Sequence, residues 1–182
     1  MSERIERPMG AAIEPDTKDW TWVLSEQCPE CGLTASDIVP TQIGSLVREQ
    51  LPRWQSVLAR PDARRRPSPD VWSPLEYACH VRDVYLLFAE RVELMLDHDD
   101  PQFANWDQDV TAVESDYGSQ DPAVVSEELV AAGDVVARVF DNVADDAWDR
   151  TGRRSDGSTF TVATLGQYFI HDVVHHLHDV DA

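Results

Sequence analysis

Apolar residues recur at three- and four-residue spacing in four separate stretches of the chain, which is the pattern of amphipathic helices that bury one face. Three of these stretches run from Pro74 to Asp97, from Pro122 to about residue 140, and from about Thr161 to Asp179. The first spans residues 41–59, and its apolar positions are Ile43, Leu46, Val47, Leu51, Trp54, Val57 and Leu58. Together they predict an all-α fold, a four-helix bundle.

Two of these helices have clear start sequences. Ser73 is placed to cap the second helix, with Pro74 at its first position and Glu76 three residues after the cap, which completes a capping box. Asp121 and Pro122 begin the third helix in the same way. We therefore expect the second helix to start at Pro74.

The remaining segments are irregular. Residues 1–19 are polar and lack periodicity, whereas residues 20–39 contain an aromatic opening and the sequence CPECG. Residues 1–39 are therefore predicted to form a short N-terminal extension, and residues 40–182 the bundle. The connection over residues 98–121 is longer than most structureless loops, so we expect it to contain a short helix or to carry function.

The charge narrows the range of partners. Fourteen Arg and one Lys face 34 Asp and Glu, for a formal net charge of −19. Such a chain repels phosphate backbones and anionic headgroups, so we expect neither nucleic acid nor a membrane surface as its partner. The excess of Arg over Lys is also associated with GC-rich bacterial genomes. The sequence leaves the oligomeric state undetermined, and a homodimer is compatible with it.

No apolar run is long enough for a membrane span, and the first residues do not resemble a signal peptide, so a cytoplasmic location is expected. The cysteines are Cys28, Cys31 and Cys79, an odd number that argues against a disulfide framework. Cys28 and Cys31 in CPECG resemble half of a zinc knuckle. The usual second cysteine pair is missing, so packing or turn formation is the simpler interpretation.

Candidate metal ligands lie in the last helix. His171 and His175 are four residues apart, so their imidazoles project from one helix face with Cβ atoms about 5–6 Å apart. A pair of this kind can hold a divalent ion, although a solvated pair of histidines has the same spacing. A third ligand must come from another element. His80 is the candidate, because it lies among apolar residues where an unpaired imidazole would be costly to bury.

The surroundings of these histidines resemble those of a known family. The run WSPLEYACHVRDV, followed about ninety residues later by FIHDVVHH, resembles the DinB-like four-helix superfamily over roughly residues 40–180. That superfamily includes thiol-dependent S-transferases and mycothiol-dependent maleylpyruvate isomerases. In it, the histidine after a W-S-x-x-E segment and two histidines four apart on the last helix form a metal site. The resemblance therefore implies one divalent ion at His80, His171 and His175.

Three functions are compatible with such a centre. The resemblance favours activation of a low-molecular-weight thiol, such as mycothiol, for S-transfer to an electrophilic substrate. A metal-dependent hydrolase or isomerase that uses a metal-bound water is the second possibility. The third is a non-catalytic metal- or ligand-binding helical module. Zinc is the first candidate ion, and nickel and iron stay open because affinity order does not settle occupancy in the cell.

Neighbouring polar residues leave alternatives open. His176 lies about 100° around the helix from His175, so we expect it at the surface or supporting a ligand, whereas His178 shares the ligand stripe and could compete. Asp172 or Asp179 could hold an imidazole in one tautomer. The loop around Trp106 could cover the metal pocket or simply be solvated.

A small basic patch precedes the last helix in this acidic chain. It consists of Arg150, Arg153 and Arg154. These residues could receive an anionic substrate, but pairing with local aspartates is the simpler expectation.

Overall fold

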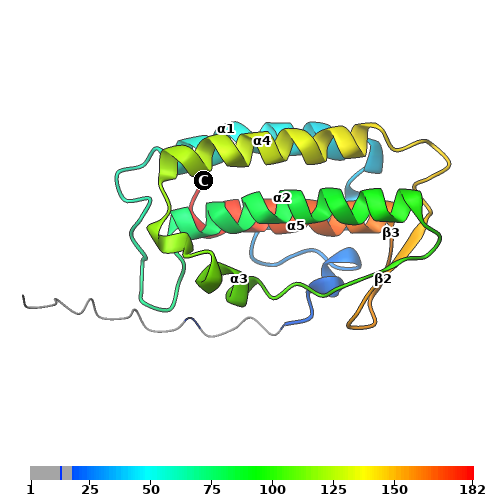
Figure 1. The fold of residues 1–182 in the computed structure, drawn as a ribbon, viewed down its shortest axis with the longest axis horizontal. Coiled ribbons are helices and arrows are strands. Elements are labelled where there is room, and N and C mark those ends of the chain that lie inside the picture. The colour runs from blue at the N-terminus through cyan, green and yellow to red at the C-terminus, as the bar shows by residue number, and fades with distance from the viewer. Residues whose placement is uncertain (1–12, 14–17) are drawn as a thin grey trace, which may run out of the picture.

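The computed structural model describes residue 13 and residues 18–182 of the chain. Its four long helices are α1 (Ile43–Leu58), α2 (Pro74–Asp97), α4 (Pro122–Asp141) and α5 (Val162–Asp179), which form a bundle (Figure 1). Helix α4 packs against α1 and α2, and α5 packs against the same two helices. A mainly helical fold is thus confirmed. Within the described residues a fifth, short helix, α3 (Gln108–Glu114), is added in the long connection.

The helix starts follow the predicted capping. The Ser73 side chain accepts a hydrogen bond from the Glu76 backbone, and the Glu76 carboxylate accepts one from the Ser73 backbone N–H at 2.8 Å. Asp121 caps α4 by accepting hydrogen bonds from Ala123 and Val124. These side chains satisfy backbone donors that the first helical turn leaves unpaired.

A small sheet corrects the all-α prediction. It consists of β1 (Gln102–Phe103), β2 (Thr151–Arg154) and β3 (Thr159–Thr161), in which β2 is parallel to β1 and antiparallel to β3 (Figure 1). The β2–β3 hairpin turns at Gly157, whose φ of 99° suits glycine. Strands of two to four residues are too short to show the alternation by which a sequence reveals a strand.

The segment before the bundle lies along α5. It contains the 3-10 turns η1 (Trp20–Leu24), η2 (Ala35–Asp37) and η3 (Pro40–Gln42), and all three contact α5. Val23 and Ala35 are fully buried. Residues 20–39 are therefore packed on the bundle, while the expected arm over residues 1–19 lies almost entirely outside the described residues. The division at residues 39 and 40 stays a prediction.

The core lies between the four long helices. Its largest fully buried side chains include Trp54, Tyr85, Leu129, Phe140, Leu165 and Phe169. Phe140 and Phe88 each stack on Phe169, with ring centroids 5.7 and 5.1 Å apart. In the part of the chain that the structure describes, no helix combines the length and apolar character needed to cross a bilayer.

Candidate metal centre

His80 lies in the middle of the bundle wall, on α2, and its side chain is fully buried. Neither of its ring nitrogens has a hydrogen-bond partner. Burial lowers the pKa of His80, so its imidazole is neutral and keeps a lone pair at neutral pH. A buried polar group without a partner is costly, and coordination of a cation by that lone pair would offset the cost.

Two residues of α5 face His80. Asp172 Oδ1 lies 3.5 Å from His80 Nε2, and His176 Nε2 lies 3.8 Å from the same Asp172 oxygen. The ring of His176 stands edge-on to His80 with centroids 4.8 Å apart. We call His80, Asp172 and His176 the pocket cluster, whose ligand atoms lie within 4.8 Å of one another.

The pocket cluster has the donors and spacing that a divalent ion requires. Imidazole nitrogen and carboxylate oxygen bind zinc at about 2.0–2.2 Å, which at tetrahedral angles separates them by roughly 3.3–3.5 Å. Asp172 Oδ1 is buried and, like His80, has no hydrogen-bond partner. Although burial opposes its ionisation, His176 and His80 lower the pKa of Asp172 to about 2, so the carboxylate is charged. These residues fit a bound cation.

A second carboxylate orients His176. Its Nδ1 and Asp179 Oδ2 are 2.8 Å apart. A carboxylate only accepts hydrogen bonds, so Nδ1 carries the proton and donates it to Asp179. The lone pair of a neutral His176 is then on Nε2, the nitrogen that faces Asp172. Carboxylates commonly fix metal-binding histidines in this way.

A cavity of about 810 Å³ opens beside the pocket cluster. Its wall includes all three residues of the cluster and two tryptophans, Trp72 and Trp106. Trp106 stacks on His80 with an interplanar angle of 12° and ring centroids 5.3 Å apart. An ion held here would have protein ligands on one side and substrate-sized space on the other.

Two arginines line the same cavity. Arg91 lies over the rings of Phe88 and Phe103, and burial lowers its pKa to about 10. No carboxylate forms an ion pair with Arg91 among the residues that the structure describes. Arg154 pairs with Asp156 at 2.8 Å and also lies in the wall. Acidic side chains outnumber basic ones in this wall, so the buried guanidinium of Arg91 is a local positive group that could bind an anion in a mainly acidic cavity.

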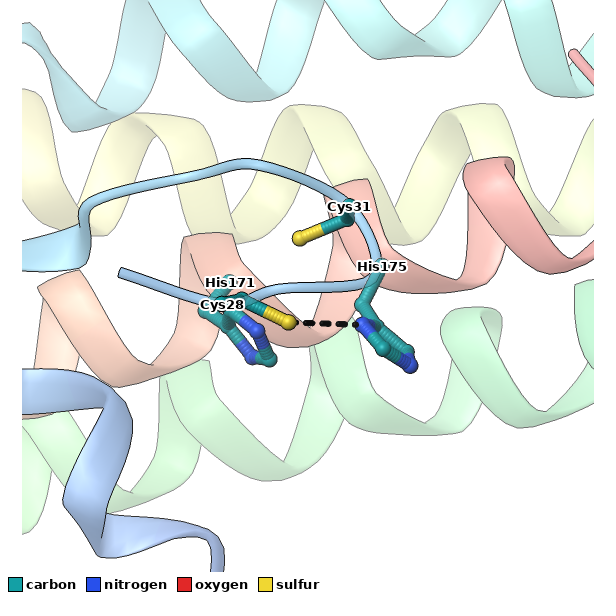
Figure 2. Close-up of side chains that lie close together, drawn as sticks. All are labelled: Cys28, Cys31, His171 and His175. Carbon is teal, nitrogen blue, oxygen red and sulfur yellow. Dashed lines mark hydrogen bonds between the residues drawn. The ribbon is translucent and has the colours of Figure 1, made fainter. Parts of the chain in front are cut away.

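The three histidines expected to bind one ion are divided between two clusters. His171 and His175 also line the cavity, but their ligand atoms group with the thiols of Cys28 and Cys31 (Figure 2). We call these four residues the knuckle cluster. Positions 171 and 175 share one face of α5, and positions 172 and 176 lie about 100° further around. His80 faces the second pair. Whether any of these residues binds metal stays a prediction.

Comparison with known proteins places the chain in a family. The sequence profile of the DinB superfamily matches residues 45–180. The chain belongs to the DinB superfamily. A search of curated proteins found no match to this sequence. The profile thus covers all of the bundle except the first two residues of α1, includes the α5 residues of both clusters, and leaves Cys28 and Cys31 outside.

Two solved structures resemble this DinB protein. One is YfiT from Bacillus subtilis, a proposed metal-dependent hydrolase with an unusual four-helix bundle topology. The TM-score is 0.65 and the sequence identity 16%, and the match covers 86% of this chain and 89% of YfiT. The other is a mycothiol-dependent maleylpyruvate isomerase, with a TM-score of 0.65, 12% identity, and coverage of 82% and 64%. At these identities the likeness establishes the DinB fold alone.

Sequence reasoning named two residues of the pocket cluster, Asp172 and His176, but only in supporting roles and not as ligands. Asp172 and His176 have the same four-residue spacing as His171 and His175, so spacing alone could not choose between the pairs. His176 was expected at the surface or in support, but it lies beside His80 and Tyr77. The deciding fact is which face of α5 turns toward α2.

The other candidates have simpler surroundings. His178 is exposed and belongs to neither cluster. The predicted basic patch is neutralised locally, since Arg150 pairs with Asp99 and Arg153 with Asp100. Within the loop, Asp107 caps α3 by accepting from Val110. Trp106, one residue earlier, covers His80, so this part of the loop lies over the pocket and is not simply solvated.

Proposed function

We propose that this DinB protein is a metal-dependent enzyme that holds one divalent ion at His80, Asp172 and His176. The observation that carries this proposal is the pair of buried, unpartnered ligand groups, His80 and Asp172, at the wall of a large cavity. The donor set of two imidazoles and one carboxylate suits zinc, nickel or iron, and zinc is the first to test.

We further propose that the reaction is S-transfer from a low-molecular-weight thiol to an electrophilic substrate. When bound, the ion would supply a Lewis acid that lowers the pKa of a thiol, near roughly 8.5 when free, and so yields a thiolate nucleophile. The expected thiol is of the mycothiol type. The maleylpyruvate isomerase of the same fold depends on mycothiol, which supports trying that thiol first.

The residues of the chain have distinct roles in this proposal. Asp179 holds the His176 ring in one tautomer, and Trp106 stacks on one face of the His80 ring. Arg91 has a buried guanidinium that lines the cavity and can bind an anionic group of the thiol or of the electrophile. Catalysis would then combine an activated sulfur with a fixed orientation of the substrate.

A hydrolase or isomerase is the second candidate. YfiT, proposed to be a metal-dependent hydrolase, has the same fold and supports this alternative. Acidic side chains also line the cavity, among them Glu30 and Asp109, and a carboxylate there could accept a proton. Dependence on added thiol separates the two reactions. A non-catalytic module would be favoured instead if a fourth protein ligand closed the site.

The first test is the metal content of the purified protein and its variants. We expect His80→Ala and His176→Ala each to lose one equivalent of metal per chain, since each removes a ligand of the pocket cluster. His178→Ala is the matched control, because it removes an exposed histidine from the same helix. Inductively coupled plasma mass spectrometry gives the stoichiometry. Full metal content in both ligand variants would refute the assignment.

Activity is then measured with each loaded form. The wild-type protein should conjugate mycothiol to an electrophile such as chlorodinitrobenzene or a maleylpyruvate analogue. His80→Ala should lose most or all of this conjugation rate. Bacillithiol and glutathione are the comparison thiols. Hydrolysis of amide or ester substrates that proceeds equally well without thiol would favour the second candidate over S-transfer.

A further inference from the structure

A tight turn brings Cys28 and Cys31 to one side of the N-terminal segment. The Gly32 N–H donates to the Cys28 carbonyl and the Cys28 N–H donates to the Leu33 carbonyl, both at 2.9 Å. Gly32 has a φ of 74°, which a residue with a side chain rarely adopts. The CPECG sequence therefore forms a closed loop, and both cysteines are free thiols.

The loop lies against α5 at His171 and His175, as Figure 2 shows. The Cys28 Sγ is 3.6 Å from His175 Nδ1. Cys28, His171 and His175 are all at least nine-tenths buried. His171 Nε2 has no hydrogen-bond partner. A buried ring nitrogen without a partner is costly, and coordination of a cation would offset that cost.

We propose that the knuckle cluster is a second metal site, a Cys2His2 zinc centre built from Cys28, Cys31, His171 and His175. The spacing is C-x2-C in the loop and H-x3-H on the helix, which is that of Cys2His2 zinc sites. Zinc bound at about 2.3 Å to sulfur and 2.0–2.1 Å to nitrogen separates the two by roughly 3.6 Å. The measured Cys28–His175 distance agrees with this separation.

All four ligand atoms already lie within 4.8 Å of one another. Bound zinc would draw them to roughly 3.3–3.8 Å, through small side-chain rotations. A carboxylate also stands behind one ligand, because Glu30 Oε2 is 3.2 Å from His175 Nε2. With Nδ1 facing the thiol, the Nε2–H of His175 donates to Glu30, which fixes the tautomer as in many zinc sites.

The centre is structural, because four protein ligands fill a tetrahedral shell and leave no open position. It fastens the segment of residues 20–39 to the helix that also carries Asp172 and His176. The same segment contributes Trp20 and Glu30 to the cavity wall. The zinc centre would therefore hold one wall of the cavity in place. The inference stands apart from the proposed function, since its ligands are different residues.

Cobalt substitution of the reduced wild-type protein is the decisive experiment. Cobalt bound to thiolates gives an intense near-ultraviolet charge-transfer band, whereas the pocket cluster offers nitrogen and oxygen alone. We expect the full intensity of that band to correspond to one thiolate-bound cobalt per chain, in addition to any cobalt held by the pocket cluster. Absence of the band from protein that has bound cobalt, or from protein that binds none, would overturn the inference. This measurement needs no substitution, so a folding defect cannot obscure it.

Substitutions then identify the ligands. Cys28→Ser with Cys31→Ser should lose one equivalent of zinc and the whole charge-transfer band, while His80→Ala should keep the band. Cys79→Ala is the matched control, because it also removes a buried thiol but one that contacts Tyr117 and Gln120 instead. A double cysteine variant with wild-type zinc content, or a band that disappears with Cys79, would contradict the assignment.

Discussion

His171 and Asp172 are adjacent in sequence but belong to different clusters. The step of about 100° per residue turns His171 and His175 toward the N-terminal loop, and turns Asp172 and His176 toward His80 on α2. Two turns of one helix thus supply four of the seven candidate ligands. The chemistry of each residue is set by the element that its helix face meets.

Asp179 shows how much a residue without a ligand position can contribute. Asp179→Asn should weaken metal binding at the pocket cluster about 10–100-fold, because the His176 ring loses the carboxylate that fixes its tautomer. Competition with a chelating dye measures this affinity, on protein whose knuckle cluster is already loaded with zinc.

The exposed Asp145→Asn variant is the charge-matched control for that measurement. It also removes one negative charge but belongs to neither cluster. Equal affinity in Asp179→Asn and Asp145→Asn would show that long-range charge, or nothing at all, underlies the effect of Asp179.

Helix α2 begins with a network of hydrogen bonds, only part of which could be predicted from the sequence. The capping box of Ser73 and Glu76 is confirmed. The structure adds Arg66, whose guanidinium forms hydrogen bonds to both oxygens of the buried Glu76 carboxylate. Glu76 is therefore occupied in fastening the preceding loop to the start of α2, four residues before His80.

Replacing Glu76 tests this network. Glu76→Gln should lower the free energy of unfolding by about 1–3 kcal/mol at pH 7, because a charged hydrogen-bond acceptor is lost opposite Arg66. Burial alone would raise the pKa of Glu76, but Arg66 and Ser73 lower it below the ordinary value of 4.5. The carboxylate thus stabilises the fold above its unfolded pKa, and the benefit is lost as pH falls through the lower, folded value.

Urea unfolding from pH 7 down to pH 3 therefore provides the measurement. Wild-type and Glu76→Gln stabilities should converge toward the acidic end of the range. A difference between them that stays constant with pH would mean that the charge of Glu76 is not its source.

Long elements that sustain a regular hydrophobic periodicity were predictable from the sequence, and short elements were not. The sequence predicted all four long helices and the caps of α2 and α4, because each depends on residues within a few positions of one another. The three strands escaped because each has only two to four residues, and because β1 pairs with β2 across about fifty positions, as Gln102 does with Arg153. Only the tertiary fold brings those backbones together.

At the scale of the whole molecule, the same limit explains the candidate sites. The sequence singled out His80, His171 and His175 as residues with metal chemistry, and all three line one cavity. It could not assign partners, because Cys28 and His175 are 147 residues apart and their contact depends on how the N-terminal segment lies along α5. The resemblance of Cys28 and Cys31 to half of a zinc knuckle was visible in the sequence, but only the fold shows that His171 and His175 lie beside them.

Metal removal should loosen one part of the molecule and leave the rest folded. With zinc at a hundredfold excess over its dissociation constant, the closed state gains about 2.7 kcal/mol, so chelation should increase the open population of residues 20–39 about a hundredfold. Limited proteolysis should then cut this segment, while far-ultraviolet circular dichroism keeps the helical signal of the bundle.

The Cys28→Ser, Cys31→Ser variant provides the comparison. The protease should cut this variant as fast as it cuts the chelated wild-type protein, with or without chelator, because the variant lacks the proposed zinc centre in both conditions. Equal protection of the wild-type segment before and after chelation would mean that Val23, Ala35 and the other buried side chains hold it without metal.

Each cluster has an indole beside it. Trp106 stacks on His80 of the pocket cluster, and Trp20 lies 5.1 Å from His175 and 5.9 Å from His171 of the knuckle cluster, measured between ring centroids. A cation that binds an imidazole changes the electric field at the neighbouring indole. If the two proposed centres bind metal, the knuckle cluster should change the intrinsic fluorescence of Trp20, and the pocket cluster should change that of Trp106 and of Trp72, which also lies beside His80.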